Sequence, residues 1–487
     1  MMRIVYLDID SLRPDHLGCY GYGRTTSPNI DKIAKRGVRF THAFCASSPC
    51  VPSRASFVSG RFAINHGALT HWGPGGRFYY PEAGGHSERY AFFPRHVRKA
   101  GYKTVTFSSF GDRHLAPWFF SGWNEVHSFT LKGGAENADE VNGEVVPWLR
   151  AHGRDEDYFL HIQYWDAHGF YTYPEEYIEP FLHAEPLDFP SPDELERQRQ
   201  LAHPRSPEFF HWSLDWPIPD KMPRHLRDKV DVDRLIAGYD GGIAYLDHHI
   251  GQILDVLRDI GVEDEVCFII TADHGESFGE QGIYMEHGMA SESTHHVPLI
   301  MTFPGLARAG AVCDQLVYNV DVVATIADLL GLDVPTGWDG RPFTSLLDGS
   351  STQWSRDSLV LEHGLYACQR AVRDERFFFM RTYHTGFYDW EPVVLYDLLE
   401  DPHQLVNVAG KYPDVVHQMD TRLNDWLADN VRRHGEIVDP MQEILQTGPF
   451  RYFGPREWEQ RLLEEGAVDL ARALRERYPE AFATRSI

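Results

Sequence analysis

Acidic residues and histidines follow three strand-like segments of the sequence, at the point where each segment ends. Because the carboxyl ends of parallel strands meet at one edge of an α/β sheet, we expect these side chains to lie together. Carboxylate oxygens are preferred ligands of Ca²⁺, Mg²⁺ and Mn²⁺, and a histidine can join them. Taken alone, Asp273 is explained equally well as the cap of a following helix. With Asp10 at a neighbouring strand end, the pattern favours a metal site made by Asp10, Asp273 and His274.

Two carboxylates compete for the first position of this site. Asp8 and Asp10 lie on the same side of the first strand, opposite Leu7 and Ile9, so alternation along the strand does not choose between them. Asp10 is nearer the carboxyl end, where the crevice of such a sheet lies. We therefore expect Asp10 to bind the metal and Asp8 to be a buried, hydrogen-bonded supporting residue.

The segment SPCVPSRAS at residues 48–56 places a cysteine at the predicted start of a helix. Pro52 precedes an apolar run, which is typical of the first turn of a helix. The positive end of the helix dipole favours an anion at Cys50, and Arg54, one turn further along, can turn back to a bound oxyanion or a thiolate. The alternative is a buried structural cysteine, the commonest fate of an isolated cysteine.

Strand-like segments alternate with helical ones over most of the chain. The strand candidates are 4–9, 102–108, 158–164, 265–271 and 299–303, and the clearest helices are 138–151, 232–260 and 319–330. This alternation predicts an α/β fold in which a mostly parallel sheet is sandwiched by helices.

Two regions depart from this alternation. Residues 174–230 are rich in proline and aromatic residues, which suggests a lid or substrate-shaping insertion, or else a surface excursion or oligomer contact. Segments 376–382 and 393–396 predict a small antiparallel sheet, and a helical tail follows from 411. We therefore predict a catalytic domain over 1–355 and a smaller α+β domain over 356–487.

Composition narrows the class of protein. The 487 residues are 43% hydrophobic and 24% charged, as in an ordinary globular protein. The net charge of −25 argues against nucleic acid or an anionic membrane as the main partner. No apolar run is long enough to span a membrane, and the first residues do not resemble a secretory signal. Six cysteines without a CxxC pair favour a reducing compartment, so we expect a cytoplasmic location.

Several motifs, in order along the chain, resemble those of the sulfatase family. The matching segments are DSLRPDHLGCYG at 10–21, CVPSR at 50–54, AGY at 100–102, TADHGE at 271–276, VPL at 297–299 and LYDL at 395–398. The CVPSR segment matches the family's CxPxR signature. The resemblance runs from residue 3 to about residue 410. It implies an alkaline-phosphatase-like α/β fold with a smaller C-terminal domain.

The resemblance also implies how the site works. The cysteine at the position of Cys50 would be oxidised after translation to formylglycine, an aldehyde, by a maturation enzyme. The aldehyde hydrates to a geminal diol, one hydroxyl attacks sulfur, and collapse of the diol expels sulfate. The metal would be Ca²⁺, held by Asp10, Asp273 and His274, with Mg²⁺ or Mn²⁺ as alternatives. Arg54 and the metal would hold the attacking hydroxyl deprotonated.

Three histidines correspond to catalytic positions of the family. His168 matches the histidine that protonates the leaving oxygen, although a strand-end histidine bonded to the backbone is the alternative. His114 lies in GDRH at 111–114, displaced by a few residues from the family's GKWH, and is expected to be the base for the diol. Asp112 then replaces the lysine of that motif, and His287 takes the place of a second family lysine.

The chain is poor in lysine near these positions. It has 8 lysines against 38 arginines and 26 histidines, and none lies between 132 and 221 or between 229 and 411. We therefore expect histidine and arginine to bind the anionic group of the substrate. A histidine is charged at neutral pH only if carboxylates such as Glu286 raise its pKa. Ser11 stands where many members carry a second acidic or amide ligand, so one metal contact is expected to be weaker.

The predicted function is a sulfuric ester hydrolase that acts on a small-molecule or saccharide sulfate, and a homo-oligomer is one assembly that the sequence leaves open. The same superfamily offers an alternative, a phosphonate monoester or phosphodiester hydrolase, which residues 164–168 (YWDAH) resemble. A third hypothesis is that Cys50 stays unmodified and the protein binds a metal without catalysis.

The substrate itself is not encoded in a recognisable motif. Aromatic residues of the insertion and the glycine-rich stretch from Gly73 to Gly85 are suited to shaping a sugar site, or they pack a lid or a subunit contact. The insertion residues are Phe209, Phe210, Trp212 and Trp216. His66 and His71, just beyond the nucleophile helix, are expected to be structural or pocket-lining rather than catalytic.

Overall fold

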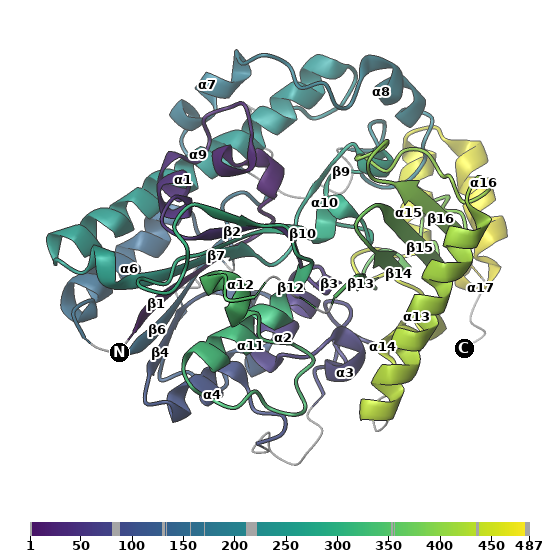
Figure 1. The fold of residues 1–487 in the computed structure, drawn as a ribbon. Coiled ribbons are helices and arrows are strands. Elements are labelled where there is room, and N and C mark those ends of the chain that lie inside the picture. The colour runs from purple at the N-terminus through teal and green to yellow at the C-terminus, as the bar shows by residue number, and fades with distance from the viewer. Residues whose placement is uncertain are drawn as a thin grey trace.

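The computed structural model describes residues 2–79, 88–128, 132, 134–155, 157–169, 171–210, 222–351, 354, 356–434 and 438–482. Within these residues, a nine-stranded sheet forms the centre of the molecule (Figure 1). Its strand order is β11-β2-β10-β7-β1-β6-β4-β5, and β12 also pairs with β2. The strands are β1 (Arg3–Ile9), β2 (Val38–Phe44), β4 (Lys103–Phe107), β5 (Glu125–His127), β6 (Tyr158–Tyr164), β7 (Val266–Ala272), β10 (His296–Met301), β11 (Ala311–Cys313) and β12 (Val317–Tyr318).

Most strands of this sheet run parallel. β1 pairs in parallel with β6 and β7, and β4 pairs in parallel with β5 and β6. β6 and β7 are buried at every residue, as expected for strands that are covered on both faces. The predicted α/β fold with a mostly parallel sheet is confirmed.

β10 is antiparallel to both of its neighbours, β2 and β7. The sequence pattern predicts this strand at 299–303, whereas it spans His296–Met301. β2 is a strand that the pattern does not predict. Its sequence VRFTHAF interrupts the apolar residues with Arg39, Thr41 and His42, which are only partly buried.

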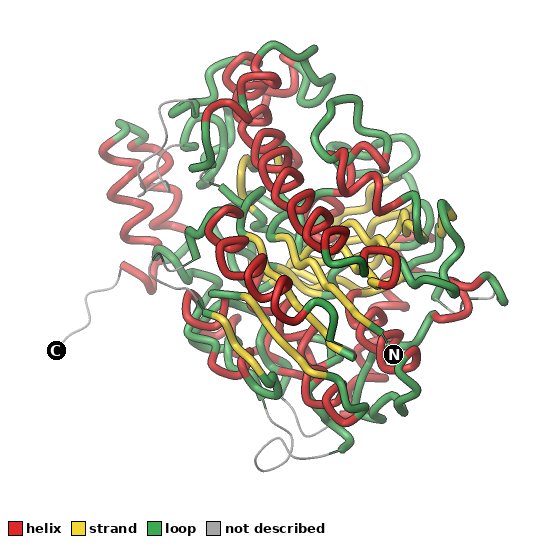
Figure 2. Tube along the Cα trace, turned by 90° about the vertical axis from the view of Figure 1, so that its left-hand side faces the viewer, coloured by secondary structure: helices red, strands yellow, loops and turns green. Residues whose placement is uncertain are grey.

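Helices cover both faces of the sheet, as Figures 1 and 2 show. One face carries α1 (Pro28–Ala34), α6 (Ala138–His152) and the 31-residue α9 (Lys229–Asp259). The other carries α2 (Cys50–Ser59), α4 (Phe93–Lys99), α11 (Asn319–Leu329) and α12 (Thr344–Asp348). The side chain of Asp228 caps α9 by accepting hydrogen bonds from the backbone of Val230 and Asp231.

A second, smaller sheet lies beside the first in the order β16-β15-β14-β13-β3. Four of its strands come from the C-terminal part of the chain and are antiparallel. The fifth, β3 (Ser47–Ser48), comes from the segment just before Cys50 and pairs in parallel with β13. The four C-terminal strands are β13 (Leu359–His363), β14 (Cys368–Arg373), β15 (Phe377–His384) and β16 (Val393–Asp397). The small sheet therefore supports the start of α2 directly.

Helices follow the small sheet, as the pattern from residue 411 predicts. They are α13 (Pro413–His434), α14 (Pro440–Thr447), α15 (Pro455–Glu464), α16 (Val468–Arg477) and α17 (Pro479–Phe482). Among the described residues, no helix combines the length and the apolar character that crossing a membrane requires. The predicted domain boundary between residues 355 and 356 stays a prediction.

The proline-rich insertion contains short helices and packs against the rest of the molecule. Its elements are η5 (Glu175–Tyr177), α7 (Glu179–Leu182) and α8 (Pro192–Gln198). Phe209 and Phe210 are buried, and the ring of Phe209 lies 5.4 Å from that of Trp458 in α15. These two phenylalanines therefore pack in the interior instead of shaping a sugar site. Trp212, Trp216 and Gly85 lie outside the described residues.

Candidate active site

The predicted metal ligands meet at the carboxyl edge of the central sheet. Ile9 at the end of β1 pairs with Ala272 at the end of β7, so Asp10 and Asp273 leave adjacent strands at the same level. The ligand atoms of Asp10, Asp273, His274 and Cys50 all lie within 4.8 Å of one another, and all four residues are buried. The structure thus brings together Asp10 and Asp273, which are 263 positions apart in the sequence. This convergence follows from the parallel pairing of β1 and β7.

Cys50 is the first residue of α2, as predicted. Its Sγ lies 3.2 Å from Nε2 of His274. Burial raises the pKa of the Cys50 thiol well above its ordinary value, with Asp10 and Asp273 adding to the effect. An unmodified thiol at this position is therefore protonated at neutral pH.

The guanidinium of Arg54 donates hydrogen bonds to three carboxylates. Its Nη1 lies 3.0 Å from Oδ2 of Asp10 and 2.5 Å from Oδ2 of Asp273. Its Nε donates to Oδ2 of Asp8 over 2.8 Å. Arg54 thus forms a set of buried ion pairs, and its predicted contact with a bound oxyanion or a thiolate stays a prediction.

The donor set fits a divalent cation. Burial raises the pKa of Asp273 well above its usual range, and Asp10 and Asp8 raise it further, although Arg54 opposes them. Three buried carboxylates thus face a single guanidinium, which cannot neutralise all of them. A divalent cation held by Asp10, Asp273 and His274 would supply the missing positive charge, and oxygen donors with one imidazole suit Ca²⁺, Mg²⁺ or Mn²⁺.

Asp8 and Ser11 support the two aspartates. Oδ2 of Asp8 lies 3.3 Å from Nε2 of His161 as well as close to Arg54, so Asp8 is buried and hydrogen-bonded as predicted. The Ser11 hydroxyl donates to Oδ1 of Asp10 over 3.0 Å, and its backbone N–H donates to Oδ1 of Asp273 over 3.2 Å. Ser11 has a φ of 59°, a strained value for serine that aims its backbone N–H at Asp273.

His287 lies between two carboxylates and against His274. Its Nδ1 is 3.5 Å from Oε1 of Glu276, its Nε2 is 3.5 Å from Oε1 of Glu286, and its ring centroid is 4.2 Å from that of His274. Burial disfavours the charged imidazolium, but Glu286 and Glu276 outweigh burial and raise the pKa of His287 to about 9. Glu286 is the carboxylate that the sequence analysis names as able to raise this pKa, and the binding of substrate by His287 stays a prediction.

His168 lies in the loop that follows β6, four residues after the strand ends at Tyr164. Its Nδ1 is 2.6 Å from the backbone carbonyl of Gly169, which leaves Nε2 for another partner. Burial lowers the pKa of His168, with Arg113 acting in the same direction and Asp10 against it. Ala167, just before it, has a φ of 89°, so the loop holds the imidazole in a strained backbone turn.

His114 follows α5 (Phe110–Arg113), and its ring centroid lies 4.8 Å from that of His71. Burial lowers the pKa of His114 well below its ordinary value, and Arg113 and Arg54 lower it further. A neutral imidazole can accept a proton, as a base must. Three buried ring nitrogens, Nε2 of His71 and His114 and Nδ1 of His287, have no hydrogen-bond partner within the described residues.

Arg113 is a site residue that the sequence analysis missed. Its charge lowers the pKa of Cys50, Asp10 and His168, so the guanidinium lies within electrostatic reach of the reaction centre. Asp112, which aligns with the family lysine, instead accepts a hydrogen bond from Ser128 at an exposed position. The signal was present in GDRH at 111–114, where the cation stands one residue later than in the family motif.

Residues from the C-terminal part of the chain complete the surroundings of the site. The Tyr452 hydroxyl lies 2.5 Å from Nδ1 of His71, and burial raises the pKa of Tyr452, with Cys50 and Glu286 adding to the effect. His363 of β13 lies 3.0 Å from the hydroxyl of Ser48, two residues before Cys50. His71 therefore lines the site, as one of the two alternatives predicted.

His66 has a structural place, which was the other alternative. Its Nε2 lies 3.1 Å from the hydroxyl of Ser56 in α2, and its ring stacks on Phe78. Its pKa is lowered far below its ordinary value by burial, so it is a neutral packing residue.

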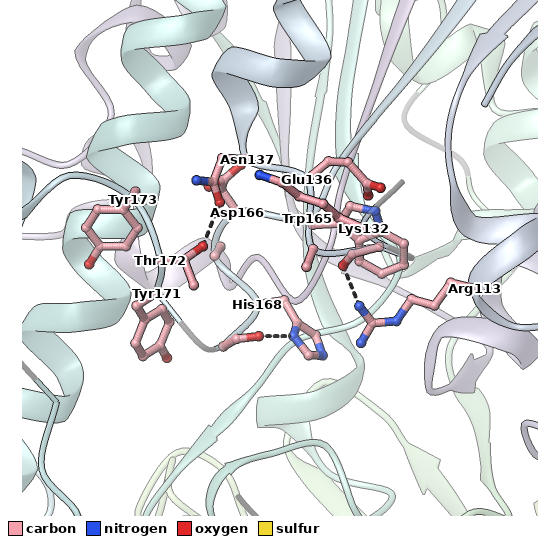
Figure 3. Close-up of a pocket in the computed structure, with 14 residues that line it drawn as sticks. Arg113, Lys132, Glu136, Asn137, Trp165, Asp166, His168, Tyr171, Thr172 and Tyr173 are labelled. Carbon is pink, nitrogen blue, oxygen red and sulfur yellow. Dashed lines mark hydrogen bonds between the residues drawn. The ribbon is translucent and has the colours of Figure 1, made fainter. Parts of the chain in front are cut away.

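A cavity of about 460 Å³ opens beside His168 (Figure 3). It lies between the loop after β6, the start of α6 and Arg113. Asp166, which belongs to the YWDAH segment at 164–168, lines it together with aromatic and polar residues. In Figure 3, Arg113 and Tyr171 lie on opposite sides of His168. The volume is in the range of small-molecule sites, about 300–1,000 Å³.

Comparison with known proteins gives a consistent result. The family model described as Sulfatase matches residues 3–332, and the one described as N-sulphoglucosamine sulphohydrolase, C-terminal matches residues 279–429. The chain is 22% identical to the N-acetylglucosamine-6-O-sulfatase of Bacteroides thetaiotaomicron, over 84% of this chain and 83% of that protein.

Solved structures share the fold. The phosphonate monoester hydrolase of Agrobacterium radiobacter superposes with a TM-score of 0.69 at 22% identity, over 88% of this chain and 96% of its own. A structure in complex with its substrate D-glucosamine-2-N,6-O-disulfate superposes with a TM-score of 0.71 at 18% identity, over 90% of this chain and 99% of its own. At these identities the superpositions show a common fold.

Proposed function

This chain belongs to the sulfatase family and is a sulfuric ester hydrolase; we propose that it acts on the sulfate ester of a saccharide or another small alcohol, through formylglycine at Cys50. The observation that carries the proposal is the buried cluster of Cys50 with Asp10, Asp273 and His274, whose ligand atoms lie within 4.8 Å of one another. The N-acetylglucosamine-6-O-sulfatase among its relatives supports a saccharide substrate.

Two groups complete this site in the proposed enzyme. A divalent cation on Asp10, Asp273 and His274, with Ca²⁺ proposed and Mg²⁺ or Mn²⁺ as alternatives, supplies positive charge to the sulfate oxygens. Formylglycine, made from Cys50 by a maturation enzyme, supplies a hydroxyl nucleophile at the start of α2.

The remaining side chains of the site have separate roles. Arg54 holds the carboxylates of Asp8, Asp10 and Asp273 together and so fixes the ligands in place. His287 and Arg113 provide the positive charge that lysines provide elsewhere in the family, and so bind the sulfate group.

Two histidines are proposed to move protons. His114, kept neutral by burial, accepts a proton from the hydrated nucleophile. His168 presents Nε2 beside the cavity and gives a proton to the leaving oxygen. Because burial lowers its pKa, His168 must gain its proton as the substrate's negative charge arrives.

Hydrolysis of a phosphonate monoester or phosphodiester is the second candidate, favoured by the shared fold with the phosphonate monoester hydrolase. A phosphonate monoester, a phosphodiester and a sulfate monoester each carry one negative charge, so the two candidates are separated by their relative rates and not by the charge that the site must bind. The sulfatase family assignment favours sulfate for this chain.

The test has two parts. The protein is produced together with a formylglycine-generating enzyme, and the mass of the Cys50 peptide is measured. The kcat/KM for nitrophenyl sulfate is then compared with that for a nitrophenyl phosphonate ester. Formylglycine with a preference for sulfate is expected. An intact thiol in the protein from its native host would overturn the mechanism, and a preference for the phosphonate ester would establish the second candidate.

A further inference from the structure

The cavity beside His168 contains buried polar atoms that the protein leaves without partners. Within the described residues, Oδ2 of Asp166, Oε1 of Glu136 and the hydroxyl of Tyr171 have no hydrogen-bond partner. All three residues line the cavity, and their exposed fractions are 7%, 3% and 2%. Buried polar atoms are nearly always paired in native proteins, so three unpaired atoms around one cavity indicate a ligand that pairs them.

The protein orients these groups by other contacts. Oε2 of Glu136 accepts a hydrogen bond from the hydroxyl of Ser109, which itself accepts one from Nε1 of Trp165. Only the other carboxylate oxygen of Glu136 is therefore left unpaired. Tyr171 has a φ of 57°, a strained value that holds this residue at the cavity wall.

The chemistry of the three atoms selects a class of ligand. A carboxylate oxygen can only accept a hydrogen bond, whereas a phenol can donate or accept one. Burial raises the pKa of Asp166 to about 8, so this side chain is a neutral acid at pH 7 and can also donate. A ring that carries several hydroxyls satisfies all three groups at once, whereas an aryl ring or a quaternary ammonium group has no N–H or O–H to offer and leaves them unpaired.

The position of the cavity decides which part of the substrate enters it. His168, the proposed proton donor to the leaving oxygen, lies on its wall, and Arg113 lies next to it. Arg113 is held by a hydrogen bond to the carbonyl of Gly134 and by the ring of Trp165, 4.5 Å from its guanidinium. The sulfate end of a substrate therefore meets Arg113, and the alcohol end extends into the cavity.

We propose that this cavity binds the leaving group as a sugar ring with free hydroxyls, and that Glu136, Asp166 and Tyr171 determine specificity for it. The inference rests on the proposed sulfatase function and adds the class of alcohol and the residues that recognise it. A site built to pair hydroxyls rejects an analogue that lacks them by a large factor.

The experiment compares a hexose sulfate with nitrophenyl sulfate in matched variants. Tyr171→Phe removes one unpaired hydroxyl and no hydrogen bond within the described residues, and Asp166→Asn removes the acid while keeping its size. Each is expected to lower the ratio of kcat/KM for the hexose sulfate to that for nitrophenyl sulfate by roughly tenfold or more. The melting temperature of Tyr171→Phe is expected to be equal to or higher than that of the wild type.

Two control variants lie outside the cavity. Tyr245→Phe removes a hydroxyl that is paired with Asp139, and Glu144→Gln changes an exposed acid of α6. The first is expected to lower the melting temperature, and both are expected to leave the substrate ratio unchanged. A ratio that also stays unchanged in Tyr171→Phe and Asp166→Asn would overturn the inference while nitrophenyl sulfate turnover upholds the proposed function.

A different result, measured on the wild type, would refute the proposed sulfatase function itself. If the wild type, with formylglycine present, hydrolyses neither sulfate, the sulfatase proposal falls and the inference falls with it. If a melting temperature well below that of the wild type accompanies a parallel loss of both activities in Tyr171→Phe, the hydroxyl is structural and the inference is overturned.

Discussion

The guanidinium of Arg113 lies over the indole ring of Trp165, 4.5 Å from the ring centroid. Trp165 belongs to the loop that carries His168, so this contact joins the end of α5 to the loop after β6. The arginine is thereby held where its charge reaches Cys50 and Asp10. This placement gives the site a positioned arginine in a chain that has no lysine between residues 132 and 221.

Arg113→Ala is expected to lower kcat/KM for a sulfate ester roughly 100-fold, because the site loses a positioned donor to the sulfate. Arg113→Lys should retain part of the activity, since it keeps the charge but not the planar fork. The matched control is Asp112→Asn, whose carboxylate lies at an exposed position outside the site. Steady-state kinetics give kcat/KM for the three variants. A larger loss of kcat/KM in Asp112→Asn than in Arg113→Ala would refute the role of Arg113.

His287→Ala is expected to lower kcat/KM by roughly 100-fold, because the cation between Glu276 and Glu286 disappears. Glu286 keeps its ion pair with Arg205, whereas the buried carboxylate of Glu276 loses the imidazolium beside it. His287→Lys restores a cation and should recover activity to within about tenfold of the wild type. Activity of His287→Lys no better than that of His287→Ala, at equal thermal stability, would show that the imidazole has a role other than its charge.

Metal binding should stabilise the fold. Addition of Ca²⁺ is expected to raise the melting temperature, and a chelator to lower it, because a ligand that binds only the folded state shifts unfolding by mass action. In Asp10→Asn the response to Ca²⁺ should be lost, whereas it should persist in the exposed control Asp193→Asn. An undiminished response in Asp10→Asn would place the cation elsewhere.

Tyr452→Phe tests whether the C-terminal part of the chain takes part in the site. The variant loses the hydrogen bond to His71, and stability is expected to fall by about 1 kcal/mol. Activity should fall by roughly threefold to tenfold, because His71 packs against the proposed base His114. Denaturant unfolding and kinetics measure the two effects. A loss of stability with unchanged activity would confine Tyr452 to a structural role.

Asp166 should make stability depend on pH. Burial raises its pKa to about 8 in the folded state, from about 4 in the unfolded chain. The folded state thus holds a proton that the unfolded state releases, so the stabilisation is complete below about pH 4 and is lost as the pH rises to about 8.

Asp166→Asn removes this titration and is expected to raise the melting temperature relative to the wild type at about pH 8 more than at about pH 5. Asp139 and Glu140 of α6 also raise the pKa of Asp166, so Glu140→Gln should reduce the effect in the wild-type background. Parallel melting curves of the wild type and Asp166→Asn across this pH range would contradict the assignment.

The fold class and the centre of the site follow from local sequence. Short apolar runs predict the buried strands β1 and β7. Asp10, Asp273 and His274 directly follow the carboxyl ends of these two strands. Because parallel strands place those ends at one edge, order along the chain is enough to predict that the three residues meet. The start of α2 at Cys50 follows equally from Pro52 and the apolar run behind it.

Other contacts arise only when distant segments pack. Polar residues interrupt the apolar pattern of β2, so the sequence does not predict this strand. Its place in the sheet comes from its antiparallel pairing with β10. No local pattern shows that Ser47–Ser48 joins the C-terminal sheet, or that Tyr452 reaches His71. These contacts depend on how two sheets and a helical tail are placed against each other.

The sequence by itself therefore determined the family, the fold class and the residues at the strand ends, because those depend on spacing and on the direction of parallel strands. The tertiary structure decided that Arg113, and not Asp112, faces the site, since one residue of shift around a short helix turns a side chain to the other face. It also decided which polar atoms around His168 remain unpaired, since pairing depends on every neighbour in three dimensions.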